Sequence, residues 1–379
     1  MTATIPPGSI IGILGGGQLG RMTSMAARSL GYHLHILDPD PNCAARYVSD
    51  LCVTAPFDDA VSAAYLASKC HVVTLEIEKI GAEALQAVSR HTPLRPGAEV
   101  LHVIQDRARQ KNWIAGKGFP SGPFRCASSA MELASAVRDL GGDCFVKSCT
   151  GGYDGRSQVR VKQEAEVASA WETLGSAPCV VEKALDLEAE LSVLVARRPG
   201  GEIAVYPPAL NHHENRILAW SVLPGPLPER TNTGAVKIAA DLAGALQVEG
   251  LLVVELFLTK DGKVLVNELA PRPHNSFHQT ERACVTSQFE QHVRAVCNLP
   301  LGSVEVLRPA AIVNLLGEVW LGERPPDFNA ALSIPGVRLH LYGKSNPRKG
   351  RKMGHLSAIG PTPGDAVKAA QEAYKRLAG

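Results

Sequence analysis

An Asp-Gly pair at residues 261–262 lies between two apolar segments and constrains the fold more than any other feature of the chain. Such a pair between aliphatic and β-branched runs predicts a β-hairpin with a two-residue turn. In that register Lys260 pairs with Lys263, so Glu255 lies directly opposite Glu268. Facing carboxylates repel each other, and the pattern therefore favours a bound cation. The alternative interpretation is a solvent-facing hairpin with two unrelated surface acids.

The ligand atoms at this hairpin indicate which cation it would bind. Glu255, Glu268 and the adjacent Asn267 offer oxygen, which suits Mg²⁺ rather than Zn²⁺. Magnesium that is held by one or two carboxylates usually also binds substrate phosphates. We therefore expect a nucleotide at this site.

Length, composition and charge limit the number of domains and the kinds of partner that the chain can have. The 379 residues, 45% hydrophobic and 20% charged, are enough for a sizeable core and two or three domains. A net charge of +2 gives no broad basic field, so composition does not indicate a nucleic-acid partner. We find no signal-peptide pattern and no apolar run long enough for a membrane span, which predicts a cytosolic protein. The nine cysteines form no Cys-x-x-Cys pair and are expected to be reduced thiols.

Residues 10–38 have the pattern of a strand, a glycine turn, a helix and a second strand. The turn Gly-Gly-Gly-Gln-Leu-Gly at 15–20 fits G-x-G-x-x-G, and the second strand ends at Asp38. This pattern is typical of dinucleotide-binding domains, so an NAD-dependent dehydrogenase is one hypothesis. The glycines are equally explained by a tight turn and close helix packing. Further strands at 51–54 and 71–75 predict a doubly wound parallel sheet, with Gln18 and Glu76 beyond its carboxyl edge.

A second glycine-rich segment follows a strand that ends in Lys147. The residues after it, Gly-Gly-Tyr-Asp-Gly at 151–155, predict a hairpin loop that closes over phosphates, without a P-loop motif. A flexible hairpin tip is the alternative. Downstream, Glu182 and Glu190 lie in strand-like segments where backbone groups can bind an adenine edge and a carboxylate can bind a ribose. Both acids could also be ordinary edge-strand charges.

Taken in order, these motifs resemble the ATP-grasp superfamily and, within it, the N5-carboxyaminoimidazole ribonucleotide synthases. The resemblance spans nearly the whole chain and includes Asp106-Arg107 with Lys111, Arg-Pro-His-Asn-Ser at 272–276 and Arg-Lys-Met-Gly-His at 351–355. It implies an α/β ATP-grasp fold with a Rossmann-like first domain that binds a ribonucleotide instead of NAD. The implied domains are residues 1–105, a grasp domain at 106–298 with a mobile lid at about 120–185, and a small α/β domain at 299–379 that completes the substrate site.

The same resemblance implies the site residues. The magnesium ligands are Glu255 and Glu268. Contacts to ATP are implied for Arg107, Lys147, Gly152, Tyr153, Asp154, Gly155, Arg156, Ser157, Gln158, Glu182, Lys183, Ala184, Leu185, Glu190, His213, Asn267 and Glu268. Contacts to aminoimidazole ribonucleotide and bicarbonate are implied for Gln18, Glu76, Tyr153, Arg272, His274, Asn275, Ser276, Arg351 and Lys352. Catalytic roles are implied for Tyr153, Asp154, Arg272, His274 and Lys352.

Three positions depart from the family pattern. Ser157 and Phe277 stand where glycine is usual, and Leu75 stands where an aromatic residue is usual. Phe277 follows the Asn-Ser pair of the implied substrate site, so the sequence alone does not determine the fit near the substrate.

The implied chemistry is ATP-dependent carboxylation of aminoimidazole ribonucleotide in purine synthesis, with bicarbonate activated as carboxyphosphate. Such an intermediate requires a site that excludes water. The resemblance also implies small-molecule substrates and a homodimer, and nothing indicates a nucleic-acid or membrane partner. Two rival hypotheses are another ATP-grasp ligase, such as a formate-dependent glycinamide ribonucleotide transformylase, and a non-catalytic nucleotide sensor.

Overall fold

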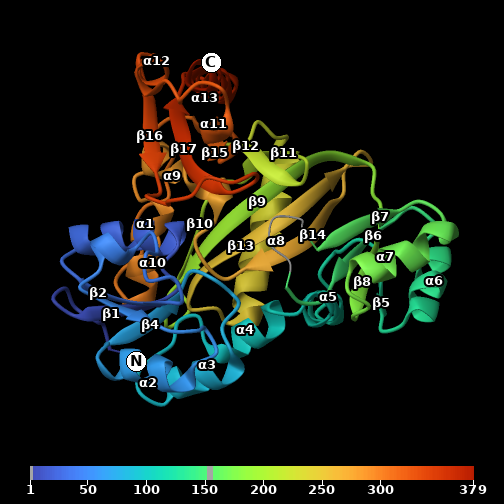
Figure 1. Ribbon diagram of the computed structural model, residues 1–379, viewed down its shortest axis with the longest axis horizontal. Helices are drawn as coiled ribbons and strands as arrows, with labels where there is room; N and C mark the ends of the chain where they lie inside the picture. Colours follow the sequence, from blue (N-terminus) through green and yellow to red (C-terminus); the bar gives the residue numbers. More distant parts are fainter. Residues whose placement is uncertain (1–2, 152–156) are drawn as a thin grey trace.

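The first structural unit is a parallel sheet with helices on its faces. The computed structural model describes residues 3–151 and 157–379 (Figure 1). Its first sheet is parallel, as the sequence alternation predicted, and the strand order is β3-β2-β1-β4. The strands and helices are β1 Ile10–Leu14, α1 Gln18–Ser29, β2 His33–Asp38, η1 Arg46–Val48, β3 Leu51–Thr54, α2 Ala60–Ser68, β4 Val72–Leu75 and α3 Ala82–Ser89.

Two helices connect this unit to a separate antiparallel sheet. Asp106 caps the second helix by accepting a hydrogen bond from the Arg109 amide, which fixes where that helix begins. The antiparallel sheet has the order β5-β8-β6-β7 and packs against α6 and α7 (Figure 1, right). The elements are α4 Ala98–Ile104, α5 Arg107–Gly116, β5 Phe124–Ala127, α6 Ala130–Asp139, β6 Cys144–Ser148, β7 Gln158–Val161, η2 Glu164–Glu166, α7 Val167–Thr173 and β8 Cys179–Lys183.

A large sheet joins the centre of the molecule to its C-terminal part. Among the described residues its order is β14-β13-β9-β11-β12-β15-β17-β16, and β10 pairs with β9. The last three strands along that order belong to the C-terminal segment, which therefore extends the central sheet instead of forming one of its own. The elements are β9 Leu187–Arg197, β10 Ile203–Val205, β11 Ala209–Glu214, β12 Ile217–Leu223, α8 Glu229–Leu246, β13 Gly250–Thr259, β14 Val264–Ala270, β15 Ala310–Leu316, β16 Val337–Leu341 and β17 Lys352–Ile359.

The helices after β14 hold the three parts together. Val293 and Val296 of α10 pack into the core of the first sheet, and His292 Nε2 lies 2.9 Å from Thr74 Oγ1. The grasp region is thus buried against the first domain over much of this segment. The remaining elements are η3 Asn275–Phe277, α9 Thr280–Ala283, α10 Gln288–Val296, α11 Glu318–Leu321, α12 Phe328–Leu332 and α13 Pro363–Ala378.

Glu255 and Glu268 of the β13–β14 hairpin lie opposite each other as predicted, but the turn and the strand register differ from the prediction. Thr259, not Lys260, pairs with Lys263 across the turn, and Gly262 has a φ of +80°. The loop is therefore three residues long, so the predicted two-residue turn is wrong. A bulge between Glu255 and Leu256 inserts Asn267 and restores the Glu255–Glu268 pairing.

No helix among residues 3–151 and 157–379 combines the length and apolarity that crossing a bilayer needs. All nine cysteines are free thiols.

Candidate active site

A cleft of about 1050 Å³ lies where the three parts of the molecule meet. Its walls come from the glycine turn of the first sheet, the β6–β8 sheet, the β13–β14 hairpin and the start of β17. Drug-sized ligands usually occupy sites of about 300–1,000 Å³, so this volume is sufficient for more than one substrate.

The bulge directs the polar side chains of the hairpin into this cleft. Residues 266–269 all contribute to the wall of the cleft. Val266 and Leu269 also pack in the core, and the polar Asn267 and Glu268 between them lie beside Glu255. A regular strand would have sent Asn267 and Glu268 to opposite faces. The arrangement explains how two consecutive residues can serve one ligand.

The positive charges near this acidic pair, from His213 and Lys147, do not outweigh burial and the mutual repulsion of the two carboxylates. Burial, together with the Glu268 charge, raises the pKa of Glu255 to about 7. Asn267 Nδ2 donates to Glu255 Oε2 at 3.3 Å, while the buried Asn267 Oδ1 has no hydrogen-bond partner among the described residues. Three oxygen-bearing side chains with an orphaned carbonyl fit a hard cation such as Mg²⁺.

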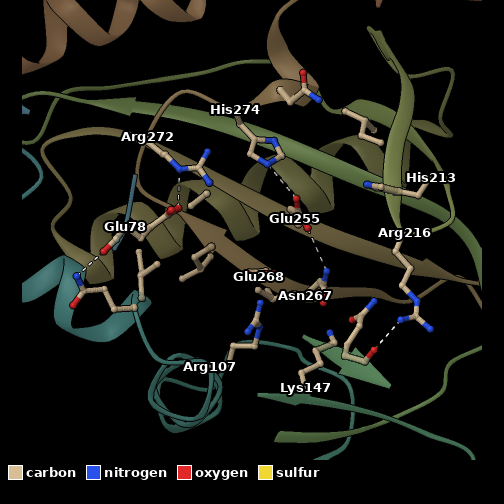
Figure 2. Close-up of a pocket in the computed structure, with 18 of the residues that line it drawn as sticks. Glu78, Arg107, Lys147, His213, Arg216, Glu255, Asn267, Glu268, Arg272 and His274 are labelled. Carbon is tan, nitrogen blue, oxygen red and sulfur yellow. Dashed lines mark hydrogen bonds and ion pairs between the residues drawn. The ribbon is translucent and has the colours of Figure 1, made fainter. Parts of the chain in front are cut away.

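His274 lies beside Glu255 and orients its carboxylate (Figure 2). Its Nε2 lies 3.3 Å from Glu255 Oε1, and its Nδ1 lies 2.8 Å from Ser276 Oγ. Burial and the neighbouring Arg272 hold the pKa of His274 well below its ordinary value, so the ring is neutral. The geometry fits a ring that donates from Nε2–H to Glu255 and accepts at Nδ1 from Ser276.

Basic side chains enter from the β6–β8 side, facing the hairpin acids (Figure 2). Lys147 Nζ and Lys111 Nζ lie 3.1 and 3.2 Å from the two carboxylate oxygens of Glu182. Burial would raise the pKa of Glu182, but the two lysines outweigh it and the net shift is downward. Arg107 is fixed by a hydrogen bond from its guanidinium to the Ser148 carbonyl, 2.8 Å away.

A second acid–base pair lies along β9 and β11. His213 Nδ1 is 3.0 Å from Glu190 Oε2. Burial opposes protonation of this ring, yet Glu190 prevails and the pKa of His213 is raised. In the turn between β11 and β12, Arg216 has a φ of +68°, and its side chain donates a hydrogen bond to the Gln158 carbonyl at 2.8 Å. The central sheet is thus linked to the strand that follows the glycine-rich loop.

The glycine turn at 15–20 binds the protein's own acids. Glu76 accepts hydrogen bonds from the Gly17 and Gly20 amides at 2.6 and 2.7 Å, and Asp38 accepts from the Gly16 amide at 2.7 Å. A Cβ on Gly17 would lie 2.4 Å from Glu76 Oε1, which explains the glycine. The amides that would bind a dinucleotide pyrophosphate are occupied, so the NAD hypothesis loses its main support.

The substrate side of the cleft contains arginine and lysine residues held by neighbours. Arg272 Nε lies 2.8 Å from Glu78 Oε1. Lys344 Nζ donates to Gln18 Oε1 at 2.6 Å and to the Lys352 carbonyl at 3.0 Å. The C-terminal segment and the first domain therefore meet through side chains at the end of the glycine turn.

Most of the site residues implied by the resemblance line this cleft. They are Gln18, Glu76, Arg107, Lys147, Gln158, Glu182, Lys183, Leu185, Glu190, His213, Glu255, Asn267, Glu268, Arg272, His274, Asn275 and Lys352. Gly152, Tyr153, Asp154, Gly155 and Arg156 lie outside the described residues.

Four of the expected residues are placed elsewhere. Ser276 is fully buried and holds His274 from behind. The Arg351 guanidinium donates to the carbonyls of its own loop, Ser345 and Asn346. Ala184 and Ser157 use backbone groups for packing, since the Ala184 amide donates to Asp143 and the Ser157 carbonyl accepts from Ser148.

The linker at 182–185 therefore offers fewer open backbone groups than expected. The Lys183 amide also donates within the protein, to the Pro123 carbonyl at 3.0 Å. The physical reason is that β8 lies between β5 and β6 in its sheet, where both edges of a strand are hydrogen-bonded.

Phe277 and Leu75, which depart from the family pattern, do not line the cleft. Phe277 is fully buried and packs edge-on against Tyr206, with ring centroids 6.3 Å apart. Phe277 does not line the cleft, because its ring points into the core of the large sheet. Leu75 is likewise buried in the core of the first sheet.

Sequence reasoning missed several side chains that line the cleft. They are Glu78, Gln105, Lys111, Arg216, Phe257 and Lys344. A usable signal existed for Lys111, which lies one helical turn after Arg107 and so shares its face. Lys344 begins the basic segment at 344–352, whose concentrated positive charge is a second local signal. Arg216 comes from a distant segment, and no local pattern indicates it.

Three family models match consecutive parts of the chain. The Ribonucleotide synthetase preATP-grasp domain matches residues 9–105, the ATP-grasp domain matches residues 113–289, and the Phosphoribosylaminoimidazole carboxylase C-terminal domain matches residues 310–369.

Individual relatives agree with these models. An N5-carboxyaminoimidazole ribonucleotide synthase of Bacillus subtilis (strain 168) is 42% identical over 354 residues, covering 93% of this chain and 92% of the relative. Its counterpart in Brucella melitensis is 39% identical over 360 residues, covering 94% and 98%. Among solved structures, an ADP complex of an N5-carboxyaminoimidazole ribonucleotide synthetase superposes with a TM-score of 0.93 at 40% identity, covering 99% and 98%. The Aspergillus clavatus enzyme with ADP and aminoimidazole ribonucleotide gives 0.90 at 32% identity, covering 97% and 98%.

Proposed function

The chain belongs to the N5-carboxyaminoimidazole ribonucleotide synthase family of ATP-grasp enzymes, and we propose that its large cleft holds ATP, bicarbonate and aminoimidazole ribonucleotide together. The protein is an ATP-dependent ligase that carboxylates 5-aminoimidazole ribonucleotide to N5-carboxyaminoimidazole ribonucleotide in purine biosynthesis. Residues from all three parts of the fold line this cleft and can divide the steps of that reaction among them.

The observation that carries the site assignment is the incompletely compensated acidic pair of the hairpin, opposite the basic side chains of the β6–β8 sheet. Glu255 and Glu268 would hold Mg²⁺, with Asn267 Oδ1 beside them. When bound, the ion supplies positive charge at the phosphates of ATP. Arg107 and Lys147 would bind the phosphates from the other side, and His213 with Glu190 would bind the ribose. Phosphoryl transfer depends mainly on such positioning and charge neutralisation.

The other end of the cleft suits bicarbonate and the ribonucleotide. Asn275 is 8% exposed, and both polar atoms of its side chain lack a hydrogen-bond partner among the described residues. Arg272, held by Glu78, supplies a fixed positive charge beside it. We assign these two residues to the activated carboxyl group, since a buried amide without a partner gains most from a bound ligand. Lys344 and Lys352 would hold the ribonucleotide.

The chemistry needs carboxyphosphate to form and to lose its phosphate out of contact with water, so that the substrate amine captures the carbon. The cleft is bounded by three parts of the fold, which allows water to be excluded once substrates fill it. His274 is neutral and already donates to Glu255, so its assigned role is to orient that carboxylate.

The decisive experiment follows ADP formation from ATP and Mg²⁺ while bicarbonate and aminoimidazole ribonucleotide are left out in turn. We expect ADP release that depends on the ribonucleotide and yields the carboxylated product. Formate-dependent turnover with glycinamide ribonucleotide would support the transformylase instead. ATP binding without turnover under every combination would support a sensor.

The family resemblance also supports a homodimer, a cytosolic location and a functional division at about residues 105 and 298. We propose these three properties for the chain. Light scattering of the purified protein tests the first, and cell fractionation tests the second.

A further inference from the structure

A cluster of three potential metal ligands lies outside the cleft, where α9 meets the C-terminal hairpin. Glu281 of α9, His340 of β16 and His355 of β17 each offer one ligand atom, and these atoms lie within 4.8 Å of one another. His340 and His355 are direct partners in the β16–β17 register, and their rings stack at 5.1 Å. None of the three residues lines the large cleft.

The surroundings of His355 resemble the outer shell of a metal ligand. Its Nδ1 lies 3.0 Å from the Tyr342 hydroxyl, which leaves Nε2 as the nitrogen open to an ion. Metal-bound histidines commonly use their second nitrogen in this way, and the contact fixes the ring orientation.

A further imidazole nearby has an unused nitrogen. His278 lies 4.9 Å from His355 between ring centroids, and it is 1% exposed. Its Nδ1 contacts Gln288, whereas its Nε2 has no hydrogen-bond partner among the described residues. His278 therefore places a buried ring nitrogen without a hydrogen-bond partner among the described residues next to the cluster.

We propose that Glu281, His340 and His355 form a second metal site, which binds a transition-metal ion of the Zn²⁺ class and is separate from the magnesium pair in the cleft. Two imidazoles and one carboxylate are ligands that Zn²⁺ accepts and Mg²⁺ does not prefer. Glu281 is exposed and His340 is partly exposed, which gives the ion a path from solvent. Arg282 and Arg338 carry positive charge near Glu281 and limit the affinity.

The ion would tie together two segments that lead into the active site. Helix α9 follows the loop with Arg272 and His274, and β17 begins at Lys352. Zn²⁺ binding at this junction should therefore stabilise the folded protein, with a rise in Tm of about 1–3 °C at saturating metal.

The test is a Zn²⁺ titration of the full chain against a chromogenic chelator, with ADP and Mg²⁺ present at saturation to occupy the cleft. We expect the wild type to bind one equivalent, and His340→Ala and Glu281→Gln each to weaken binding by about 100-fold. Substituting Co²⁺ should give the visible absorption of a low-coordinate site in the wild type but not in His340→Ala or Glu281→Gln. ADP formation without Zn²⁺ should be unchanged in His340→Ala.

His212→Ala is the matched control, because His212 and Glu214 form an exposed pair, 3.5 Å apart, away from the cluster. It should bind Zn²⁺ like the wild type. Unchanged Zn²⁺ binding in both His340→Ala and Glu281→Gln would overturn the proposal, as would loss of the zinc equivalent in Glu268→Gln. If His340→Ala does not fold, as judged by circular dichroism, Glu281→Gln at its exposed position decides the matter.

Discussion

The glycine turn at 15–20 and the hairpin at 255–268 both have the sequence appearance of ligand sites, but their polar groups are in opposite states. In the turn, the amides of Gly16, Gly17 and Gly20 are hydrogen-bonded to Asp38 and Glu76 of the protein itself. In the hairpin, Glu255 and Glu268 face each other, and Glu255 contacts the neutral His274 and the Asn267 amide, each at 3.3 Å. A site that is satisfied internally stabilises the fold, whereas one that is left charged is available for a ligand.

The strongest test of this contrast is to remove charge from the hairpin. Glu268→Gln should lower the rate of ADP formation by about 10²-fold or more, because electrostatic groups at reacting phosphates commonly contribute several kcal/mol. Asp261→Asn is the control on the same hairpin, since Asp261 is exposed and its side-chain partners in the described part of the chain are the nearby Lys263 and Thr259. Its rate should stay within about twofold of the wild type. Near wild-type turnover in Glu268→Gln would contradict the metal assignment.

A second test uses Lys352, which lines the cleft together with residues of the glycine turn and of the hairpin. Its carbonyl accepts a hydrogen bond from Lys344, whose ammonium also reaches Gln18 at the glycine turn. Lys352→Ala should raise KM for the ribonucleotide by about 10-fold, the effect of losing one charged hydrogen bond, with little change in ATP binding.

The adjacent Arg351→Ala is its matched control, since the Arg351 guanidinium is bound to its own loop. Equal losses of ribonucleotide and ATP binding in Lys352→Ala, or an equal effect of Arg351→Ala, would remove Lys352 from the ribonucleotide site.

At the glycine turn, the test is to remove the carboxylate that accepts hydrogen bonds from the backbone amides. Glu76→Ala leaves the Gly17 and Gly20 amides without their acceptor, so we expect the free energy of unfolding to fall by about 2–4 kcal/mol. Denaturant unfolding at neutral pH measures it. Glu83→Ala on the outer surface of α3 should change stability by less than about 0.5 kcal/mol. If Glu76→Ala were as stable as the wild type, the turn would not be internally satisfied.

The smallest predicted effect is a pH dependence of stability that arises at Glu255 of the hairpin. Burial and Glu268 raise the pKa of Glu255 from 4.5 to about 7 in the folded, metal-free protein. The folded state therefore keeps a proton that the unfolded chain loses in this window, and the contribution of Glu255 to stability declines as pH rises through it. Glu255→Gln removes this decline, so its Tm should exceed that of the wild type by about 1–4 °C at about pH 8.

Two measurements check this interpretation of Glu255. The Tm difference should vanish near the ordinary pKa of a glutamate, and Mg²⁺ should reduce it at high pH by binding the wild-type pair more tightly. A Tm difference between Glu255→Gln and the wild type that did not change with pH would show that it does not come from the ionisation of Glu255.

Local sequence patterns were sufficient for much of the fold. The alternation at 10–75 predicted the first parallel sheet, and the runs around Asp261-Gly262 predicted that Glu255 and Glu268 face each other. They missed the bulge at Asn267, although the consecutive polar residues Asn267 and Glu268 break the two-residue period of the strand and could have indicated it. The three-residue loop was missed because Asp-Gly fits more than one hairpin turn.

The sequence by itself determined the elements and the residue types of the site, because turn preference and hydrophobic period act over a few neighbouring residues. Only the tertiary structure decided that Glu76 closes the glycine turn, that Phe277 points into the core and that Lys344 reaches Gln18. It also decided that the C-terminal strands extend the central sheet. These contacts join residues that are far apart in the chain, and their geometry depends on how whole sheets pack, which no local pattern encodes.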